Sequence, residues 1–331
     1  MDKTIRDIYD LPSFEEMERI VCEAMKDAVK VIPDGKVADY IPELGKVSPD
    51  HLGICIYRLD GDKLKVGEAN VRFTMQSISK IIALAIALEK FGPEKVFSKV
   101  GTEPSGEAFN SLIELEQNQD KPYNPLINSG SLAVYSLLVN EISFEEMLEF
   151  TREIGSDPNI VLDEKAFESE MQTCSRNKAI AYLLESKGII QSDVMETLTL
   201  YTKMCALSVT AETLANIGKL LASDGVCLVT KKRKLSSRTV RIIKTLMLTC
   251  GMYDGSGTFA IRVGIPTKSG VGGGLLAVSD KRAGIGVFGP ALDEKGNSIA
   301  GCKLLQDISM KLRLNLFWDP EWDKEDEAVI L

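Results

Sequence analysis

The sequence predicts an α+β fold in which one antiparallel sheet is built from both ends of the chain, with a helical subdomain inserted between them. Strand-like alternation occurs early, in "GICIYRL" and "KLKVGEA", and returns only after Tyr253. Between about Ser77 and Cys250 the apolar residues recur at helical spacing instead. We therefore expect residues 1–74 and 255–331 to form a mixed sheet-and-helix part, residues 75–254 to form a helical part, and the active site to lie in a cleft between them.

The first part should contain a helix followed by a hairpin. Ser13-Phe14-Glu15-Glu16 is a capping box, so an amphipathic helix should extend from it to about Lys30. The segments 53–59 and 63–69 are separated by Asp60-Gly61-Asp62, whose residue types favour a tight turn. These two segments are expected to pair as a β-hairpin.

The middle of the chain should be mainly helical. Residues Ile81 to Leu88 are apolar on every side, as is typical of a helix enclosed in the core. A second capping box, at Ser143 to Glu146, should begin a helix that ends near Ile154. Further helices are expected at residues 177–187, 194–207, 211–223 and 237–250.

The last part should return to the sheet, with strands at residues 258–270, 274–280 and 283–289 and a final amphipathic helix at 298–317. Residues Gly284 to Gly289 match the G-x-G-x-x-G pattern of dinucleotide-binding folds, which requires a strand, a tight turn and a helix. Here the segment alternates like a strand and Pro290 follows it. We therefore expect no dinucleotide site.

The composition excludes several classes of function. At 331 residues and 44% hydrophobic, the chain can bury a substantial core, and its net charge of −9 argues against general binding of nucleic acid. The longest apolar run, Ile81 to Leu88, is far shorter than the ~20 residues that cross a membrane. One exception to the acidic character is the basic run Lys231 to Lys234. Such runs are usually solvated loops and otherwise form interface or anion-binding patches.

Cysteine and histidine usage narrows the chemistry further. The seven cysteines are scattered without a Cys-x-x-Cys pair, and the N-terminus lacks the layout of a signal peptide, so we expect a cytoplasmic protein. His51 is the only histidine, which excludes a cluster of histidine metal ligands. A serine hydrolase built on this chain would be expected to use another base.

Ser77-x-x-Lys80 is a candidate catalytic pair. At the start of a helix both side chains leave the same face, and the unpaired backbone N–H groups there suit a developing oxyanion. Lys80 is followed by Ile81 and Ile82, and desolvation lowers the pKa of a lysine. A drop of about three units from ~10.4 would make Lys80 a useful neutral base. Taken alone, however, the motif is explained by a capping serine and a snorkelling lysine.

The segment Lys268-Ser269-Gly270, on an expected edge strand, strengthens the catalytic interpretation. S-x-x-K followed later by K-[ST]-G is the order seen in serine β-lactamases and penicillin-binding proteins. The backbone of such a strand can complete an oxyanion hole opposite the helix. However, no Ser-Asp-Asn triplet lies between the two motifs and no export signal is evident, so a β-lactam target or defence enzyme is not expected.

Other polar residues suit the binding of an amino acid. "KPYNPLINSGS" contains Asn128, and "FESEMQTCSRNKAIAYLL" contains Glu170 and Asn177. Singly, these would be turn residues and a solvated carboxylate. Together they supply one carboxylate for an ammonium group and amide donors for a carboxylate. Tyr201 and Tyr253 are interpreted equally well as site residues or as half-buried packing residues.

The ordered motifs resemble those of the serine-dependent glutaminase family. They are "GKVADYIPELGKVSP", "MQSISK", "EPSGEAFNSL", "KPYNPLINSG", "RNKAIAYLL", "TCGMYDGSG" and "PTKSGVGGG", and the similarity runs from about Gly35 to Phe317. The resemblance implies a β-lactamase/transpeptidase-like fold and hydrolysis of L-glutamine to L-glutamate and ammonia. It also implies that neither a metal nor an organic cofactor is needed and that the chain forms a homodimer or homotetramer.

The resemblance further implies roles for single residues. Ser77 matches the nucleophile, Lys80 the activating lysine, Tyr201 a tyrosine that helps to move protons, and Tyr253 a tyrosine beside the serine. The backbone N–H groups of Ser77 and Val271 would form the oxyanion hole. The substrate-binding positions are matched by Tyr40, Gln76, Ser77, Asn128, Glu170, Asn177, Tyr201, Tyr253 and Val271. Whether Lys80 or Tyr201 is the immediate base stays open.

Two other functions remain open on the residues alone. One is a serine esterase, or an amidase for another amide, on the same scaffold. Glu170 with Asn177 favours a free amino acid instead, since an esterase would need an apolar pocket. The other is a non-catalytic binding module that kept the pocket. The presence of the complete set Ser77, Lys80, Tyr201 and Tyr253 argues against it, because a pure binder needs no base.

Overall fold

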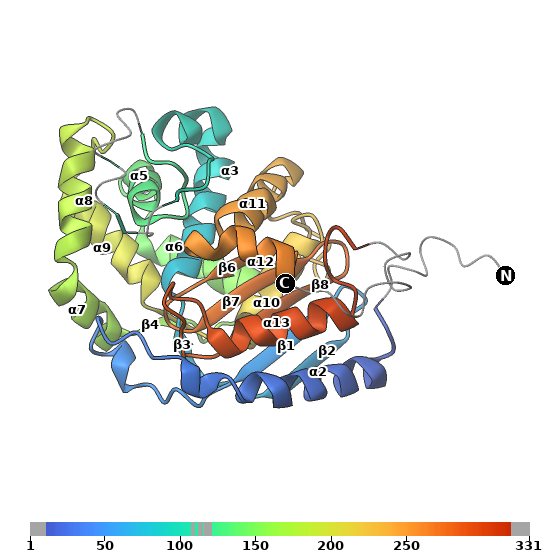
Figure 1. Cartoon of the computed structure of the whole chain (residues 1–331). Helices are drawn as coiled ribbons and strands as arrows, with labels where there is room; N and C mark the ends of the chain where they lie inside the picture. Colours follow the sequence, from blue (N-terminus) through green and yellow to red (C-terminus); the bar gives the residue numbers. More distant parts are fainter. Residues whose placement is uncertain (1–10, 107–109, 112–114, 116–120, 319–331) are drawn as a thin grey trace.

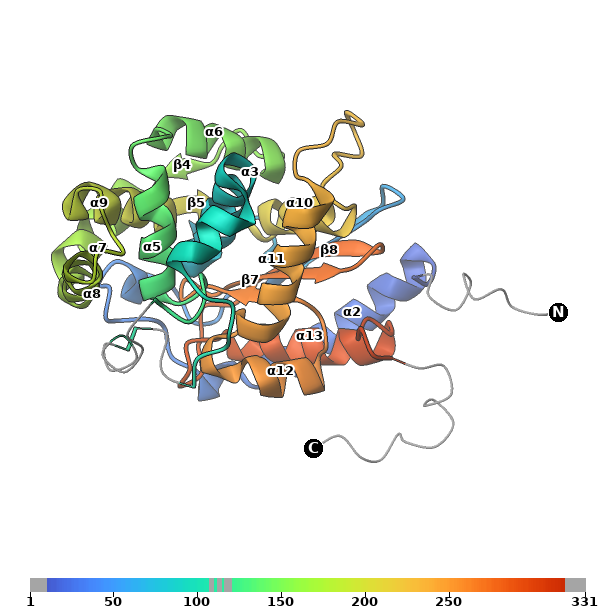
Figure 2. The ribbon, with the colours of Figure 1, turned by 90° about the horizontal axis from the view of Figure 1, so that it is seen from above.

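The computed structural model describes residues 11–106, 110, 111, 115 and 121–318 of the chain (Figure 1). These residues form a central antiparallel sheet with helices on both faces and a group of helices beside it (Figures 1 and 2). Residues 1–10 and 319–331 of the predicted sheet-and-helix part lie outside the described residues, as does part of the motif "EPSGEAFNSL". The predicted division at residues 74/75 and 254/255 stays a prediction.

The central sheet joins the two ends of the chain. Its strands lie in the order β2 (Lys63–Gly67), β1 (Gly53–Arg58), β8 (Ala283–Phe288), β7 (Gly274–Ser279) and β6 (Thr267–Ser269), and every neighbouring pair is antiparallel. Gly53 lies opposite Phe288, and Arg58 lies opposite Ala283. The predicted hairpin, the sheet built from both chain ends and the edge position of Lys268 are therefore confirmed.

Each face of this sheet is covered by helices. Because successive side chains on a strand point to opposite faces, Ile54 and Ile56 pack with α2 (Phe14–Val29) and α13 (Ile299–Lys311), and Cys55 belongs to the core on the other side. That other face carries α10 (Ala211–Ala222) (Figure 2). A Cβ atom on Gly286 would lie 1.9 Å from the carbonyl oxygen of Ala211, so α10 packs directly on β8. Gly284 to Gly289 thus belong to a packed strand and its end, as expected.

The helices of the middle part surround an apolar core. They are α3 (Ser79–Lys99), α5 (Asn128–Leu138), α6 (Phe144–Gly155), α7 (Glu164–Thr173), α8 (Ser175–Ser186), α9 (Val194–Cys205) and α11 (Ser237–Cys250). Residues Ile81 to Leu88 of α3 are all buried, as their sequence predicts. The prediction lacks α5 and α7, and it places Leu207 in a helix, although Leu207 begins a strand.

A second, small sheet was not predicted. It consists of β3 (Phe73–Thr74), β5 (Leu207–Val209) and β4 (Val161–Leu162), in that order. Strands of two or three residues are too short to show alternation, so periodicity could not reveal them. Short 3₁₀ helices complete the fold at η1 (Ile32–Asp34), η2 (Leu44–Lys46), η3 (Gln76–Ile78) and η4 (Tyr253–Gly255).

The strand predicted at residues 258–270 is mostly wrong. Residues Ser256–Arg262 form α12, and only Thr267–Ser269 of the predicted segment form a strand. The alternation of Phe259, Ile261 and Val263 suggested a strand, but Ile261 is 69% exposed, whereas Phe259 and Val263 face the core. Their spacing of four residues is that of one face of a helix.

The last predicted helix is too long. α13 has Ser298 as its N-cap and ends at Lys311, not at Phe317. Arg313 adopts a left-handed conformation (φ 55°), and the Leu314 N–H donates back to the Ser309 carbonyl at 2.8 Å, which closes the helix end. Leu312 and Leu314 are buried, so the apolar pattern continues although the helix does not. Within the described ranges, no helix is both long and apolar enough to cross a membrane.

Candidate active site

Most of the predicted site residues line one cavity of about 250 Å³. All of them except Lys80 and Tyr253 contribute to its wall, although they come from segments far apart in the chain. The predicted residues in the wall are Tyr40, Gln76, Ser77, Asn128, Glu170, Asn177, Tyr201 and Val271; the others are Ile41, Asn110, Thr173, Cys174 and Arg176. The fold therefore collects these residues around a space that suits a small molecule.

Ser77 lies in the 3₁₀ turn η3, directly before α3. Its neighbour Gln76 has φ 49°, a conformation that costs free energy for a non-glycine residue and is often found at functional sites. The turn between β6 and β7 approaches this segment closely. A Cβ on Gly270 would lie 2.7 Å from the Met75 carbonyl oxygen, so a glycine is needed there. This close approach allows Val271, which follows Gly270, to line the same cavity as Ser77.

Lys80 lies behind the cavity wall and is joined to it by hydrogen bonds. Its Nζ donates to Asn128 Oδ1 at 2.6 Å and to the Leu126 carbonyl at 3.2 Å. The Tyr201 hydroxyl donates to the same Asn128 oxygen at 3.4 Å. Asn128 in turn donates through Nδ2 to Asn177 Oδ1 at 2.9 Å. A single amide therefore positions both candidate bases.

Burial changes the acid–base chemistry of Lys80. The side chain is 1% exposed, and desolvation lowers its pKa from 10.5 to about 8, although the charge of Glu170 opposes this shift. About a tenth of the amine is therefore neutral at pH 7, and about half at pH 8. The buried Tyr201 hydroxyl behaves in the opposite sense, because desolvation raises its pKa well above the ordinary value of 10.0. Of these two side chains, Lys80 therefore loses its proton at the lower pH.

Glu170 supplies a buried carboxyl group to the same cavity. Burial raises its pKa to about 7, while the hydrogen bond from Gln76 and the charge of Lys80 act against that rise. Gln76 Nε2 donates to Glu170 Oε2 at 3.3 Å and to Thr74 Oγ1 at 3.4 Å. A cationic group bound beside Glu170 would stabilise its charged form.

Lys268 belongs to this environment, although the sequence analysis did not include it among the site residues. It is fully buried, its Nζ lies 4.5 Å from the centre of the Tyr253 ring, and it donates to the Ser269 carbonyl at 2.5 Å. Burial, and then the charge of Lys80, lower its pKa well below 10.5. Tyr253 itself lies beside Ser77, Ser269 and the Val271 backbone, whose hydrogen bonds oppose the rise in its pKa caused by burial. The K-[ST]-G motif was the available signal for Lys268.

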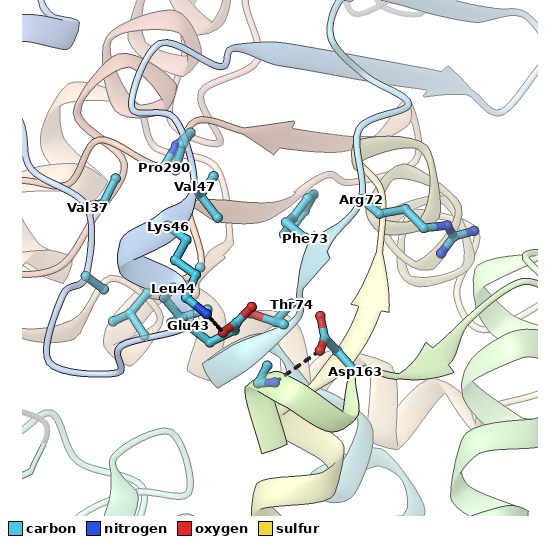
Figure 3. Close-up of a pocket in the computed structure, with 14 residues that line it drawn as sticks. Val37, Glu43, Leu44, Lys46, Val47, Arg72, Phe73, Thr74, Asp163 and Pro290 are labelled. Carbon is cyan, nitrogen blue, oxygen red and sulfur yellow. Dashed lines mark hydrogen bonds and ion pairs between the residues drawn. The ribbon is translucent and has the colours of Figure 1, made fainter. Parts of the chain in front are cut away.

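A second cavity, of about 170 Å³, is also lined by Val271. Figure 3 shows this cavity with Glu43, Lys46 and Asp163 in its wall. Its charged groups are engaged in local contacts. Lys46 pairs with Glu43, and Asp163 Oδ1 accepts from the Ala166 N–H at the start of α7 (Figure 3). The cavity therefore adds no nucleophile or base to the site. In the part of the chain that the structure describes, no group of three histidine, cysteine or acidic side chains is arranged to hold a metal ion.

The arrangement suits nucleophilic catalysis: a hydroxyl at a helix start and a buried carboxyl group line one cavity, and a partly neutral amine contacts its wall through Asn128. Comparisons with known proteins identify the family. The family model described as Glutaminase matches residues 35–317. A glutaminase of Fusobacterium nucleatum is 49% identical over 305 residues, which are 91% of this chain and 100% of the relative. The chain belongs to the glutaminase family.

Solved structures of glutaminases share the fold. "Probable glutaminase ybaS" superposes with a TM-score of 0.88 at 37% identity, covering 93% of this chain and 100% of that protein. The covalent complex between the Bacillus subtilis glutaminase YbgJ and 5-oxo-L-norleucine, formed by reaction with 6-diazo-5-oxo-L-norleucine, has a TM-score of 0.79 at 35% identity. It covers 91% of this chain and 99% of that protein. The predicted family, its enzyme class and the β-lactamase-like α+β fold are thus confirmed. The roles of single residues stay predictions.

Proposed function

We propose that this glutaminase hydrolyses the side-chain amide of L-glutamine to L-glutamate and ammonia through an acyl-enzyme on Ser77. The observation that carries the proposal is the buried Lys80, three residues after Ser77, whose pKa is lowered to about 8. A neutral amine in this place can accept the proton of the serine hydroxyl.

The reaction then has two halves. The Ser77 hydroxyl loses its proton towards Lys80, or towards Tyr201 as a relay, and its oxygen attacks the amide carbon. The backbone N–H groups of Ser77 and Val271 would stabilise the oxyanion, and the amide nitrogen takes a proton and leaves as ammonia. A water molecule, deprotonated by the same base, then attacks the ester. Glutamate leaves and Ser77 recovers its proton.

Residues of the cavity wall would select the substrate. Glu170 would pair with the α-ammonium group, and Gln76, which donates to the same carboxylate, would fix its orientation. Asn128, Asn177, Tyr40 and Tyr201 line the cavity with hydrogen-bonding groups that suit the α-carboxylate and the amide. Neither an esterase nor an empty binding module would need this combination of base and carboxylate.

The deciding experiment measures ammonia release by the purified chain from L-glutamine and, in parallel, from L-asparagine. We expect rapid release from glutamine and far slower release from asparagine, because the side chain of asparagine is one methylene shorter. The variant S77A should abolish release while its melting temperature stays near that of the wild type. Retained activity in S77A would remove the nucleophile assignment. Absence of release from either amide by a folded protein would refute the proposed reaction.

The covalent adduct offers an independent test. YbgJ reacts covalently with 6-diazo-5-oxo-L-norleucine, and we expect the same reagent to add to Ser77 of this chain. Intact-mass and peptide mass spectrometry should find the adduct on Ser77 and none in S77A.

We also propose that the protein is a cytoplasmic homodimer or homotetramer. Light scattering during size-exclusion chromatography can check the number of subunits, and cell fractionation can check the location.

A further inference from the structure

A cavity of about 400 Å³ lies away from the candidate active site, and the two cavities share no residue. Its wall is formed by α10, by the β1–β2 hairpin, by the end of α6 and by the loop between α10 and α11. Charged and polar side chains in this wall include Tyr57, Lys63, Glu153, Glu212, Asn216, Lys219, Ser223, Thr230 and Lys234. The volume lies within the usual range for small-molecule sites.

The carboxylates of this cavity already have partners. Glu212 pairs with Lys63 and also with Lys65, whose Nζ lies 2.6 Å from Oε2. Glu153 pairs with Lys234. Each carboxylate is therefore neutralised by at least one lysine, and Glu212 by two.

Lys219 is different, because its ammonium group faces no anion. The residue is 8% exposed, and its Nζ lies 3.3 Å from the centre of the Tyr57 ring. Among the residues that the structure describes, no carboxylate or carbonyl oxygen lies within hydrogen-bonding or ion-pairing distance of Lys219 Nζ. A ring face stabilises a cation on one side only, and an ammonium group has three N–H donors to satisfy. A largely buried cation therefore has unused donors beside an open cavity.

The charge around this cavity contrasts with that of the whole chain. The net charge of the protein is −9, yet Lys63, Lys219 and Lys234 line this cavity, and Lys65 also pairs with Glu212. These four lysines face only two carboxylates in the wall, Glu153 and Glu212. A local positive potential of this kind raises the concentration of small anions nearby.

The uncharged residues of the wall indicate which kind of molecule could accompany the anionic group in this cavity. Asn216, Ser223 and Thr230 offer uncharged donors and acceptors, and Leu220, Val226 and Leu228 offer apolar contacts. We propose that this cavity is a binding site for a small organic anion whose carboxylate or phosphate group takes Lys219 as its counterion. The site is separate from glutamine hydrolysis and does not depend on it.

Isothermal titration calorimetry of the full chain can test this site with three probes that share a three-carbon body. They are glycerol 3-phosphate, glycerate and glycerol. We expect at least one of the two anions to bind at millimolar concentrations and glycerol not to bind. The anion that binds identifies the preferred group. Absence of heat with both anions would overturn the proposal.

Two variants tie the binding to Lys219. K219M removes the charge but keeps the length of the side chain, and it should weaken binding about tenfold or more, as expected for a charge-assisted hydrogen bond. K203M is the matched control, since Lys203 Nζ lies 5.0 Å from the ring of Phe144 in a comparable contact outside the cavity. T230E places a negative charge at the exposed rim and should weaken binding as well, even if K219M does not fold. Unchanged binding in T230E, or in a folded K219M, would overturn the proposal.

Discussion

Lys80 Nζ donates a 2.6 Å hydrogen bond to Asn128 Oδ1, and the same oxygen accepts a hydrogen bond from the Tyr201 hydroxyl at 3.4 Å. One amide oxygen on α5 therefore holds a residue of α3 and a residue of α9. Because Asn128 also lines the substrate cavity, the proton-accepting group and the bound substrate would be positioned by the same side chain. The predictions below follow from this network and its neighbours.

The variant N128A should lose most of its activity. Without the amide oxygen, Lys80 Nζ keeps only the 3.2 Å contact with the Leu126 carbonyl and would move relative to Ser77. A displacement of about 1 Å at a reacting group can cost about a hundredfold, so we expect kcat/KM for glutamine to fall by that order. N70A is a matched control, since Asn70 Oδ1 also accepts from a lysine, Lys65, but does so on the surface. Equal activity of N128A and N70A would contradict the positioning role.

Activity should rise with pH between about 6 and 9. The reaction needs a neutral Lys80, whose pKa is about 8, and a charged Glu170, whose pKa is about 7. Both forms become populated as the pH rises. In a plot of log kcat/KM against pH, the slope should therefore fall from two to one at about pH 7 and from one to zero at about pH 8. E170Q should remove the change of slope near pH 7 and keep the one near pH 8. A single limb near 10 in the wild type would indicate an ordinary lysine and would refute the base assignment.

The K80M variant should be inactive but at least as stable as the wild type. The pKa of Lys80 is about 8 in the folded state and has its ordinary value of 10.5 in an unfolded chain, so the folded protein binds fewer protons between these pH values. The stability of the wild type therefore rises with pH across this window, by up to about 3 kcal/mol, and below it the buried charge is a cost. K80M should lack this rise, and its kcat should fall by about a thousandfold.

Denaturant unfolding near pH 7 and near pH 10 can measure the effect. K90M is the control, because Lys90 lies on the same helix but is exposed. If the wild type and K80M show the same change of unfolding free energy with pH, Lys80 does not titrate as proposed.

The fold could be predicted from the sequence where patterns are long. The hairpin of β1 and β2, the buried helix at Ile81 to Leu88 and the capping box at Ser143 all depend on local signals, and the structure contains each of them. At Ser13 only half of the predicted capping box forms: Ser13 accepts from the Glu16 N–H, whereas the Glu16 carboxylate accepts from Arg19. The sheet joining both chain ends followed from the segregation of strands and helices. Elements without an extended pattern were missed, such as the strands of two or three residues.

The predictions that failed depend on contacts between segments distant in the sequence. In residues 258–270, Phe259 and Val263 turn inwards and Ile261 turns outwards, a choice made by the neighbouring core and not by local alternation. For the site, the motifs indicated Ser77 and Lys80, but no sequence pattern places the Lys268 amine over the Tyr253 ring. That contact requires the edge strand and η4 to meet, which only the assembled fold determines.

Glu170 should discriminate by the α-amine of the substrate. E170A should raise KM for L-glutamine about tenfold to a hundredfold, because this range corresponds to the binding free energy of one charge-assisted hydrogen bond. Glutaramate has the same side-chain amide without the α-amine, so its KM should change little in the variant. E164A is a control, since Glu164 begins the same helix at an exposed position. Equal losses for the two substrates would refute the ammonium role.

Lys268 should act through Tyr253. Its amine packs on the ring of Tyr253 at 4.5 Å and donates to the Ser269 carbonyl, so it holds the tyrosine that lies beside Ser77. K268M keeps the length of the side chain but lacks both the contact of the amine with the ring and the hydrogen bond to Ser269. A buried contact between an amine and an aromatic ring contributes about 2 kcal/mol, so we expect kcat to fall about tenfold or more. KM should change much less, because Lys268 does not line the substrate cavity.

The matched control for K268M is K63M, because Lys63 Nζ lies 5.3 Å from the Tyr57 ring, remote from the site. Steady-state kinetics with glutamine should show the fall in kcat for K268M and none for K63M, and thermal melting should show both variants folded. If kcat of a folded K268M equals that of the wild type, Tyr253 is held in place without Lys268. The contact between the buried Lys268 amine and the Tyr253 ring would then serve packing alone.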